Sequence, residues 1–404
     1  MGDVGRDYGR WAAMLEGRRL PAAFVDLDAV DANVGVLCGA LEGTSVTLRV
    51  ATKSVRHPWL LRHVLERGGA RARGLMTFSA YEVAFLAAQG FDDFLMGYPV
   101  ARMDEALALA RLAAGGVEVV ATVDSAAHCA LLDEAAREVG ATIKVCLDVD
   151  ASWRPGGGLA HVGVRRSPVR SVEDALAVAD AVEGCARLRL SAVLAYEAQI
   201  ASLRDHNPTS RHLDPVRRLL KRGSEPAVLK LRGEIVAALR ARVGDLELVN
   251  GGGTGSVRFT SRDPSVTEVT AGSGFLCPHL FDGSGGLDLR PAGFFALSVA
   301  RISDPGMITC AGGGYIASGE MGADKAPIVH APAGLSPLSM EGWGEVQTPF
   351  KVSGGSRIGL GAPVICRHAK AGELAERFNT FLLVRGGAVV GEEPTYRGLG
   401  EAFM

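Results

Sequence analysis

The chain has 404 residues, more than one ordinary hydrophobic core accommodates, and 48% of them are apolar, which suits one large and one smaller domain. Its 43 basic and 45 acidic residues are interspersed, with a net charge of -2, so we expect neither a nucleic-acid surface nor a polybasic membrane patch. No apolar run reaches the roughly 20 residues that a membrane span needs, and seven cysteines without a Cys-x-x-Cys pair favour a reducing, cytoplasmic setting.

After an expected helix over Asp28–Leu41, short apolar runs alternate with helical stretches rich in alanine and leucine as far as about residue 272. Strand–helix alternation implies parallel strand pairing. Eight repeats favour a (β/α)8 TIM barrel over an open doubly wound sheet, which the pattern alone leaves as an alternative. The expected strands are Thr47–Thr52, Ala72–Thr77, Asp93–Gly97, Val117–Thr122, Ile143–Val149, Leu188–Ala195, Leu246–Asn250 and Thr267–Ala271.

Two segments depart from the alternating pattern. Residues 204–242 form a long, basic, mostly helical insertion between the sixth and seventh runs. After about residue 275, apolar runs alternate with Gly, Pro and Ser turns, which is typical of a β-rich domain. We therefore expect a barrel over residues 22–274. Residues 1–21 and 275–404 together would form a β-rich domain.

Lys53 ends the first expected strand, in the run TLRVATK. In a barrel, catalytic side chains stand at the C-terminal ends of strands. Burial and nearby cations, here Arg49 and Arg56 in the sequence, favour the neutral amine that forms a Schiff base with a carbonyl group. The alternative is a lysine that extends from the strand end into water.

Two glycine-rich loops follow the last two expected strands. The sequence NGGGTGS, residues 250–256, closes the seventh run, and AGSG, residues 271–274, closes the eighth. Backbone N–H groups and hydroxyls in such loops bind phosphate, because glycine lets the backbone approach closely. Barrel phosphate sites often use the loops after strands seven and eight, so a phosphate and Lys53 would meet at one end of the barrel.

The stretches LPAAFVDLDAVDANV, RVATKSVRHP, NGGGTGS and PVICRHAK with LVRGG resemble enzymes of the alanine-racemase fold (fold type III), which use pyridoxal 5'-phosphate (PLP). The likeness covers residues from about 20 to 400 and is closer to the branch of D-threonine aldolase and D-serine dehydratase, which includes proteins labelled amino acid deaminase/aldolase. It implies a homodimer whose pocket lies between the barrel of one subunit and the β-rich domain of the next, so that this domain completes the active site.

The resemblance also implies roles for single residues. Lys53 would be the PLP lysine, and Tyr196 would lie near the cofactor, although it could be a core tyrosine. His161 is similar to a position where the family usually carries Arg or another cation near the phenolic oxygen, and Arg165 is a second candidate; the alternatives are a loop histidine and a surface charge. The phosphate would be held by Gly252, Gly253, Thr254, Gly272 and Ser273.

The second domain departs from the family pattern at one position. Metal-dependent members carry a His-x-Asp or His-x-Cys pair, whereas here His368 is followed by Lys370, and an ammonium is a poor ligand. We therefore expect no metal. Lys370 either points to solvent or replaces the metal as a positive charge near the substrate's β-oxygen.

The resemblance implies a lyase acting on a β-hydroxy amino acid, of D configuration in this branch, in which the substrate displaces Lys53 to form an external aldimine. We favour retro-aldol cleavage, as in D-threonine aldolase, over β-elimination, as in D-serine dehydratase. A racemase would need a second base, for which Tyr315 is the candidate. Non-catalytic PLP homeostasis proteins share the barrel and lysine but lack the second domain, and a barrel that binds no PLP is the remaining alternative.

Overall fold

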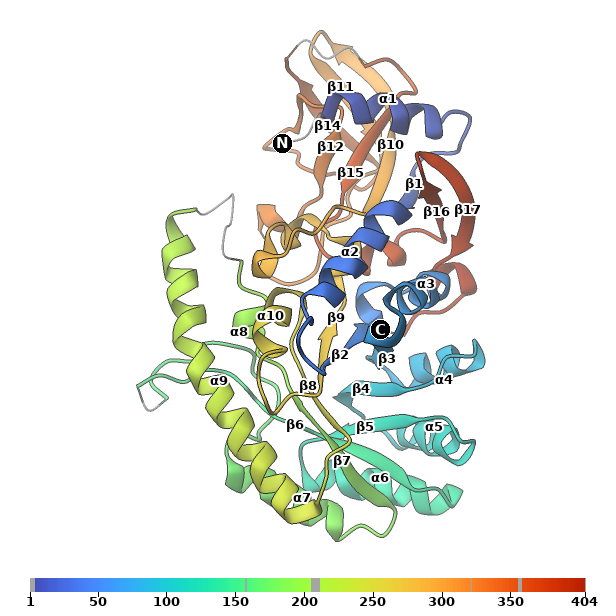
Figure 1. Ribbon diagram of the computed structural model, residues 1–404. Helices are drawn as coiled ribbons and strands as arrows, with labels where there is room; N and C mark the ends of the chain where they lie inside the picture. The colour runs from blue at the N-terminus through green and yellow to red at the C-terminus, as the bar shows by residue number, and fades with distance from the viewer. Residues whose placement is uncertain (1–3, 157, 205–210, 321, 355–357, 404) are drawn as a thin grey trace.

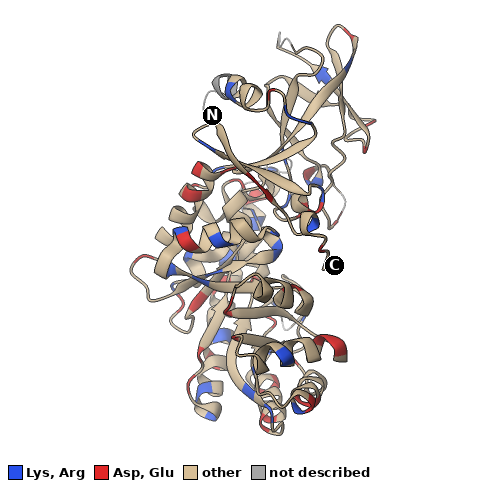
Figure 2. Cartoon of the chain, turned by 90° about the vertical axis from the view of Figure 1, so that its right-hand side faces the viewer, with Lys and Arg blue, Asp and Glu red and all other residues tan. Residues whose placement is uncertain are grey.

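The structure is a computed structural model, and it describes residues 4–156, 158–204, 211–320, 322–354 and 358–403. Figure 1 shows two parts, a barrel surrounded by helices and a sheet domain that contains the N-terminal helix and the C-terminal strands. Acidic and basic residues are interspersed along the chain in Figure 2, in agreement with the balanced charge of the sequence.

Eight parallel strands close into a barrel in chain order, and this confirms the predicted (β/α)8 architecture. Each strand overlaps the corresponding predicted run. The strands are β2 (Thr47–Ala51), β3 (Ala72–Thr77), β4 (Phe94–Pro99), β5 (Val119–Val123), β6 (Ile143–Asp148), β7 (Leu188–Ala195), β8 (Leu248–Gly251) and β9 (Glu268–Ala271).

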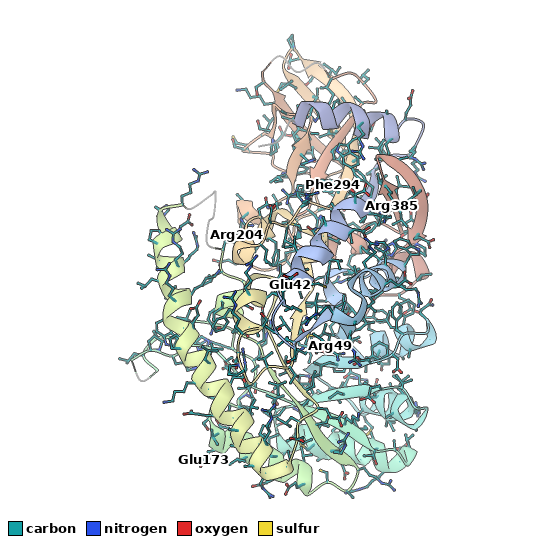
Figure 3. All side chains as sticks on the ribbon, in the orientation of Figure 1. Glu42, Arg49, Glu173, Arg204, Phe294 and Arg385 are labelled. Carbon is teal, nitrogen blue, oxygen red and sulfur yellow. The ribbon has the colours of Figure 1, made fainter. Side chains whose placement is uncertain are left out.

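The inside of the barrel contains a buried ion pair as well as apolar side chains. Arg49, labelled in Figure 3, contacts Glu268 Oε1 through Nε at 2.5 Å and Asp93 Oδ1 through Nη2 at 2.7 Å. These carboxylates compensate a guanidinium that is only 4% exposed. Arg49 is therefore committed to its own carboxylates, whereas Arg56, the other cation predicted near Lys53, donates from Nε to the Lys53 carbonyl oxygen at 3.1 Å.

Helices cover the outside of the barrel. The helix predicted over Asp28–Leu41 is α2 (Leu27–Gly39), which begins where the Asp26 carboxylate accepts the N–H groups of Asp28 and Ala29. Of the helical insertion predicted over residues 204–242, residues 205–210 lie outside the described part of the chain. The remainder contains α9 (Asp214–Val243), which runs along the outside of the barrel in Figure 1. The other helices between strands are α3 (Pro58–Gly68), α4 (Ala80–Ala88), α5 (Met103–Ala114), α6 (Ala126–Val139), α7 (Val172–Glu183), α8 (Ala198–Ala201) and α10 (Val257–Thr260). Among the described residues, no helix is both long and apolar enough to cross a membrane.

The second domain is built on a nine-stranded, mostly antiparallel sheet, as the β-rich sequence predicted. Strand β1 (Ala22–Asp26) lies inside this sheet, antiparallel to β10 (Gly293–Asp304) and parallel to β16 (Thr380–Arg385), so the sheet extends past the boundary expected at residue 21. Its other strands are β11 (Met307–Ala311), β12 (Ile328–Ala331), β13 (Leu335–Pro337), β14 (Gln347–Val352), β15 (Pro363–Arg367) and β17 (Ala388–Pro394).

The first residues add a helix to the sheet domain rather than a strand. Helix α1 (Val4–Met14) contributes Trp11, which packs against Phe24 and Phe294 with ring centroids 5.1 and 5.7 Å away. These three side chains are at most 5% exposed and form a small apolar core of their own. Burial of this aromatic cluster fixes α1 to the sheet, and Figure 3 labels Phe294 there.

Candidate active site

A cavity of about 350 Å³ lies at the C-terminal end of the barrel strands. Its walls include residues at, or directly after, the ends of all eight strands, from Ala51 on β2 to Ala271 on β9. Lys53, Tyr196 and the two glycine-rich loops all line it. The structure therefore brings together the lysine and the glycine loops that the sequence predicted to meet at this end.

Lys53 lies on a 3₁₀ turn, η1 (Thr52–Ser54), which follows β2 directly. Its Nζ donates a hydrogen bond to the Tyr98 hydroxyl at 2.8 Å and lies 5.3 Å from the centre of that ring. Burial opposes ionisation of Tyr98, but the Lys53 ammonium and the Arg166 guanidinium outweigh it and lower the pKa of the hydroxyl below its ordinary value. The amine of Lys53 is thus hydrogen-bonded inside the cavity to a phenol whose pKa is lowered.

The two glycine loops form one continuous edge of the cavity. The N–H of Gly274 donates to Thr254 Oγ1 at 3.0 Å and joins the loop after β9 to the loop after β8. Ser54 Oγ lies 3.4 Å from Ser273 Oγ, so this edge also contacts the Lys53 turn. The predicted phosphate ligands are therefore neighbours in space.

Side chains larger than hydrogen do not fit at the glycines of this edge. A Cβ at Gly272 would lie 2.7 Å from Ser54 Oγ, and a Cβ at Gly253 would lie 3.0 Å from Ala201 Cβ and 3.2 Å from Tyr196 Cε2. Such close backbone approach, with hydroxyls beside it, is the arrangement that binds phosphate. The residues at this end of the barrel thus fit a phosphorylated cofactor.

The loop after β6 places a different cation in the cavity from those the sequence indicated. His161 hydrogen-bonds the carbonyl oxygen of Val164 through Nε2 at 3.1 Å, and neither His161 nor Arg165 lines the cavity. Arg166 does, with its guanidinium 5.8 Å from the Tyr98 ring centre and 5.9 Å from that of Tyr196. Val164 and Arg166 line the cavity, whereas the intervening Arg165 does not.

Carboxyl groups from two neighbouring strands also line the cavity. Asp124 follows β5, and Asp148 is the last residue of β6. Burial, with the Asp124 carboxylate adding to it and Arg166 opposing it, raises the pKa of Asp148 to about 7. Asp148 is therefore partly protonated near neutral pH.

His368 and Lys370 line a second cavity, of about 310 Å³, and not the Lys53 cavity. Burial and the Arg367 cation lower the pKa of His368 to about 3, so its imidazole is neutral. Lys370 Nζ donates to Ser318, to the carbonyl oxygen at 2.7 Å and to Oγ at 3.3 Å. It therefore does not extend freely into solvent.

The donor set around His368 does not fit a divalent metal, because an ammonium stands at the second ligand position. Within the described part of the chain, no group of three or more His, Cys, Asp or Glu side chains is arranged to hold a metal ion. The second cavity adjoins the Lys53 turn, since Arg56 lines it and also contacts the Lys53 carbonyl oxygen.

Sequence reasoning did not single out several polar side chains that line the Lys53 cavity, and among them are Tyr98, Asp124, Asp148 and Arg166. The first three stand at, or directly after, the C-terminal end of a barrel strand, which is the signal that identified Lys53. If this strand-end signal is applied to every barrel strand, and not only to the first and the last two, it indicates these three residues as well. Arg166 lies in a loop, and no local pattern distinguishes it from Arg165.

A closed parallel barrel joined to an antiparallel sheet, with a lysine and two glycine loops at one end, is the architecture of the fold type III PLP enzymes. The sequence profile described as alanine racemase, N-terminal domain, matches residues 25–232, more than half of the chain. The protein belongs to this family.

Two solved structures share the fold over nearly the whole chain. D-threonine aldolase from Filomicrobium marinum is 21% identical with a TM-score of 0.78, over 94% of this chain and 95% of the other. D-threo-3-hydroxyaspartate dehydratase from Delftia sp. HT23 is 20% identical with a TM-score of 0.72, over 94% of this chain and 98% of the other. At these identities the likeness establishes the fold alone.

A curated protein, 3-hydroxy-D-aspartate aldolase from Paracoccus denitrificans (strain Pd 1222), is similar in sequence. It is 24% identical to this chain over 272 residues. The match covers 67% of this chain and 64% of that relative's length.

Proposed function

We propose that the protein is a PLP-dependent lyase that cleaves a D-β-hydroxy amino acid by a retro-aldol reaction. The observation that carries this proposal is that the Lys53 amine and both glycine loops line one cavity at the C-terminal end of the barrel. The names of similar proteins support the substrate class: D-threonine aldolase, D-threo-3-hydroxyaspartate dehydratase and 3-hydroxy-D-aspartate aldolase are all named for D-amino acids with a hydroxyl on Cβ.

PLP supplies the electron withdrawal that weakens the bonds to Cα of an attached amino acid. The amine of Lys53 would hold the cofactor, and it is placed to accept a proton when it is free. Tyr98 can hold or pass a proton at Lys53 Nζ, because its hydroxyl lies 2.8 Å away. Arg166 keeps a positive charge over the rings of Tyr98 and Tyr196. The phosphate would be bound by Gly252, Gly253, Thr254, Gly272 and Ser273.

Lys370 is the residue that supports the hypothesis of cleavage without a metal ion. Its ammonium is fixed on Ser318 in the cavity that adjoins the Lys53 turn. A fixed positive charge stabilises negative charge developing on an oxygen, which is the part a metal ion plays at a hydroxyl. Lys370, like the other residues of the sheet domain in the second cavity, does not line the Lys53 cavity of its own chain, so we propose that it acts in this way on the β-oxygen of a substrate held by the partner subunit of the proposed homodimer. A stoichiometric divalent metal together with loss of activity in EDTA would contradict this role.

The cofactor assignment is tested by reconstituting the apoprotein with PLP and recording its visible absorbance. We expect a band that borohydride bleaches and that is lost in Lys53→Ala. Lys351→Ala, at an exposed position of β14, is the control and should keep the band. If the wild type shows no band after reconstitution, the proposal is wrong.

The reaction is tested by supplying D-threonine and D-serine and assaying aldehyde and 2-oxoacid products separately. With 3-hydroxy-D-aspartate, whose cleavage aldehyde is itself a 2-oxoacid, glycine and ammonia are assayed instead. Retro-aldol cleavage gives glycine and an aldehyde, whereas β-elimination gives ammonia and a 2-oxoacid. We expect the aldehyde, and a 2-oxoacid alone would assign the protein as a dehydratase.

A racemase remains a weaker candidate, because Tyr315 is not in the Lys53 cavity of its own chain. Its ring packs edge-on against Phe295, with centroids 5.0 Å apart, and it lines the second cavity. In the homodimer that we propose from the family resemblance, a partner would have to supply this base. Interconversion of D- and L-alanine would test that alternative.

A further inference from the structure

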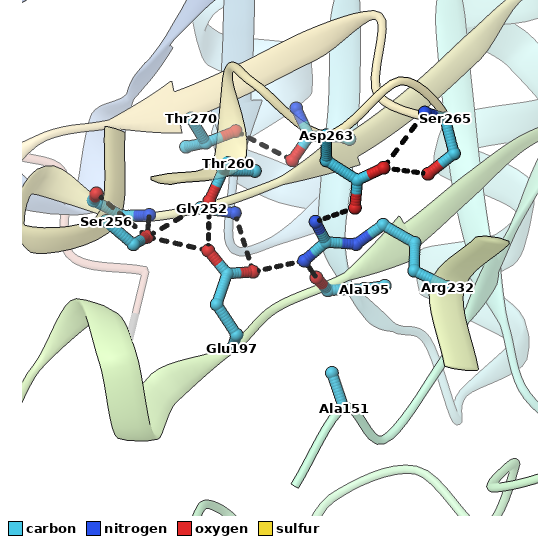
Figure 4. A network of polar contacts seen from close by, with 12 residues as sticks. Ala151, Ala195, Glu197, Arg232, Gly252, Ser256, Thr260, Asp263, Ser265 and Thr270 are labelled. Atoms are coloured by element: carbon cyan, nitrogen blue, oxygen red, sulfur yellow. Dashed lines mark hydrogen bonds and ion pairs between the residues drawn. The ribbon is translucent and has the colours of Figure 1, made fainter. Parts of the chain in front are cut away.

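A buried cluster of three charged side chains lies behind the glycine loop that follows β8, as Figure 4 shows. Arg232, on the inserted helix α9, contacts Glu197 Oε2 through Nη2 at 2.6 Å and Asp263 Oδ2 through Nη1 at 3.0 Å. All three side chains are at most 3% exposed. Charges removed from water in this way are retained only where each one is paired.

Glu197 connects this cluster to the loop itself. Its Oε2 accepts the N–H of Gly252 at 3.2 Å, and its Oε1 accepts the hydroxyls of Ser256, at 2.6 Å, and Thr260. One carboxylate therefore holds both ends of the loop Gly252–Ser256. Figure 4 shows these contacts converging on it from the loop and from Arg232.

The backbone conformation of the loop depends on the contacts that hold it. Gly252 has a φ of 84°, in the left-handed region, and a Cβ there would lie 2.7 Å from Val269 Cγ1. Arg232 Nη2 also donates to the carbonyl oxygen of Ala195 at 3.0 Å, so the end of β7 is tied to the same guanidinium. The cluster thus fixes the loop relative to both β7 and α9.

We propose that Glu197 is a positioning residue for the cofactor phosphate, and that Arg232 of the inserted helix neutralises Glu197 so that it can serve in this way. The proposal rests on the proposed function, since it assumes that the loop binds phosphate. Hydrogen-bond donors bind an anion tightly only when they are already oriented. A carboxylate behind the loop repels phosphate, and Arg232 offsets that repulsion.

The test compares PLP with pyridoxal, which lacks the phosphate but has the same aldehyde for Lys53. Dissociation constants of the apoprotein for each are measured by absorbance titration in wild type, Glu197→Gln and Ser256→Ala. A glutamine keeps the shape but replaces one accepting oxygen with an NH₂ donor. We expect both variants to bind PLP at least about tenfold more weakly, as expected for a disturbed hydrogen bond to a charged group, with pyridoxal affinity within about threefold.

The matched control is Asp133→Asn, because Asp133 is also a buried carboxylate that pairs with an arginine, Arg137, and accepts a backbone N–H, that of Arg187 at 2.8 Å. It lies on α6 and does not line the Lys53 cavity, so the ratio of the two affinities should stay at the wild-type value. Thermal unfolding of each apoprotein shows whether it is folded.

Equal weakening of PLP and pyridoxal in the variants would overturn the proposal, and so would unchanged PLP affinity. If Glu197→Gln does not fold, Ser256→Ala decides, because it removes one contact of the carboxylate without unpairing Arg232. If wild-type protein binds neither aldehyde, the proposed function itself fails. If wild type instead binds PLP more tightly than pyridoxal, and the variants keep the same ratio of affinities, only the role proposed for Glu197 fails.

Discussion

Replacement of Asp148 by asparagine should stabilise the folded apoprotein, and more so at alkaline than at acidic pH. Burial and the Asp124 carboxylate raise the pKa of Asp148 to about 7 in the folded state. In the unfolded chain an aspartate has a pKa of about 3.9. One pKa unit corresponds to about 1.4 kcal/mol, so the ionised carboxylate lowers the free energy of unfolding by up to about 4 kcal/mol above pH 7.

The direction follows from proton binding. Between about pH 4 and pH 7 the unfolded chain has released this proton while the folded protein keeps it, so the contribution of Asp148 to stability falls as the pH rises. Asparagine has nearly the same shape and does not ionise. The gain in Asp148→Asn should therefore be roughly 1–2 kcal/mol at pH 5 and approach roughly 4 kcal/mol at pH 8.

Urea unfolding of the apoprotein at the two pH values measures this gain. Asp180→Asn is the control, since Asp180 lies exposed on α7, where its pair with Arg242 contributes little, and the control should change little at either pH. A gain that is equal at pH 5 and pH 8, or a loss of stability at pH 8, would refute the reasoning.

Three further substitutions examine the two cavities. Tyr98→Phe removes the hydroxyl that contacts the reactive amine, and kcat should fall at least about 100-fold, the usual contribution of a proton-transfer group, while PLP affinity measured by titration changes little. Gly272→Ala puts a Cβ 2.7 Å from Ser54 Oγ, so we expect a loss of about 1–3 kcal/mol in urea unfolding and weaker PLP binding; unaltered binding would show that the edge tolerates side chains. Lys370→Met should lower kcat about 100- to 1000-fold if the Lys370 ammonium acts on the substrate oxygen. The control is Lys325→Met, because the Lys325 ammonium pairs with Asp324, and this variant should keep the wild-type kcat. An equal kcat in Lys370→Met and wild type would contradict the role of Lys370.

The barrel could be predicted because its signal is local. A strand buried on both faces is a short apolar run, as in β5, where all five residues are buried, and a helix follows before the next run begins. Lys53 and the glycine loops were found for the same reason, since each directly follows such a run. The position of a strand end along the chain thus suffices to place a residue at one end of the barrel.

The identity of the cationic residue that the loop after β6 contributes to the cavity could not be predicted in this way. His161, Arg165 and Arg166 lie within six residues of one another in a segment without regular structure, and only the path of that segment decides which side chain faces inward. The preference for His161 came from the family position, whereas the fold presents Arg166 to the rings of Tyr98 and Tyr196. Nothing in the local sequence separates the adjacent arginines.

The second domain also determines the position of Lys53, although it lies far away in sequence. Gly372, two residues beyond Lys370, packs so closely on the Lys53 turn that a Cβ there would overlap the Lys53 carbonyl oxygen, and its φ of 84° is in the left-handed region. Gly272 of the barrel also packs closely on this turn, since a Cβ there would lie 2.7 Å from Ser54 Oγ and 2.9 Å from Ala51 Cβ. The turn that carries the reactive amine is therefore held between a loop of the barrel and a loop of the sheet domain. Because both contacts need a glycine, the barrel and the sheet domain act as one unit in positioning this amine.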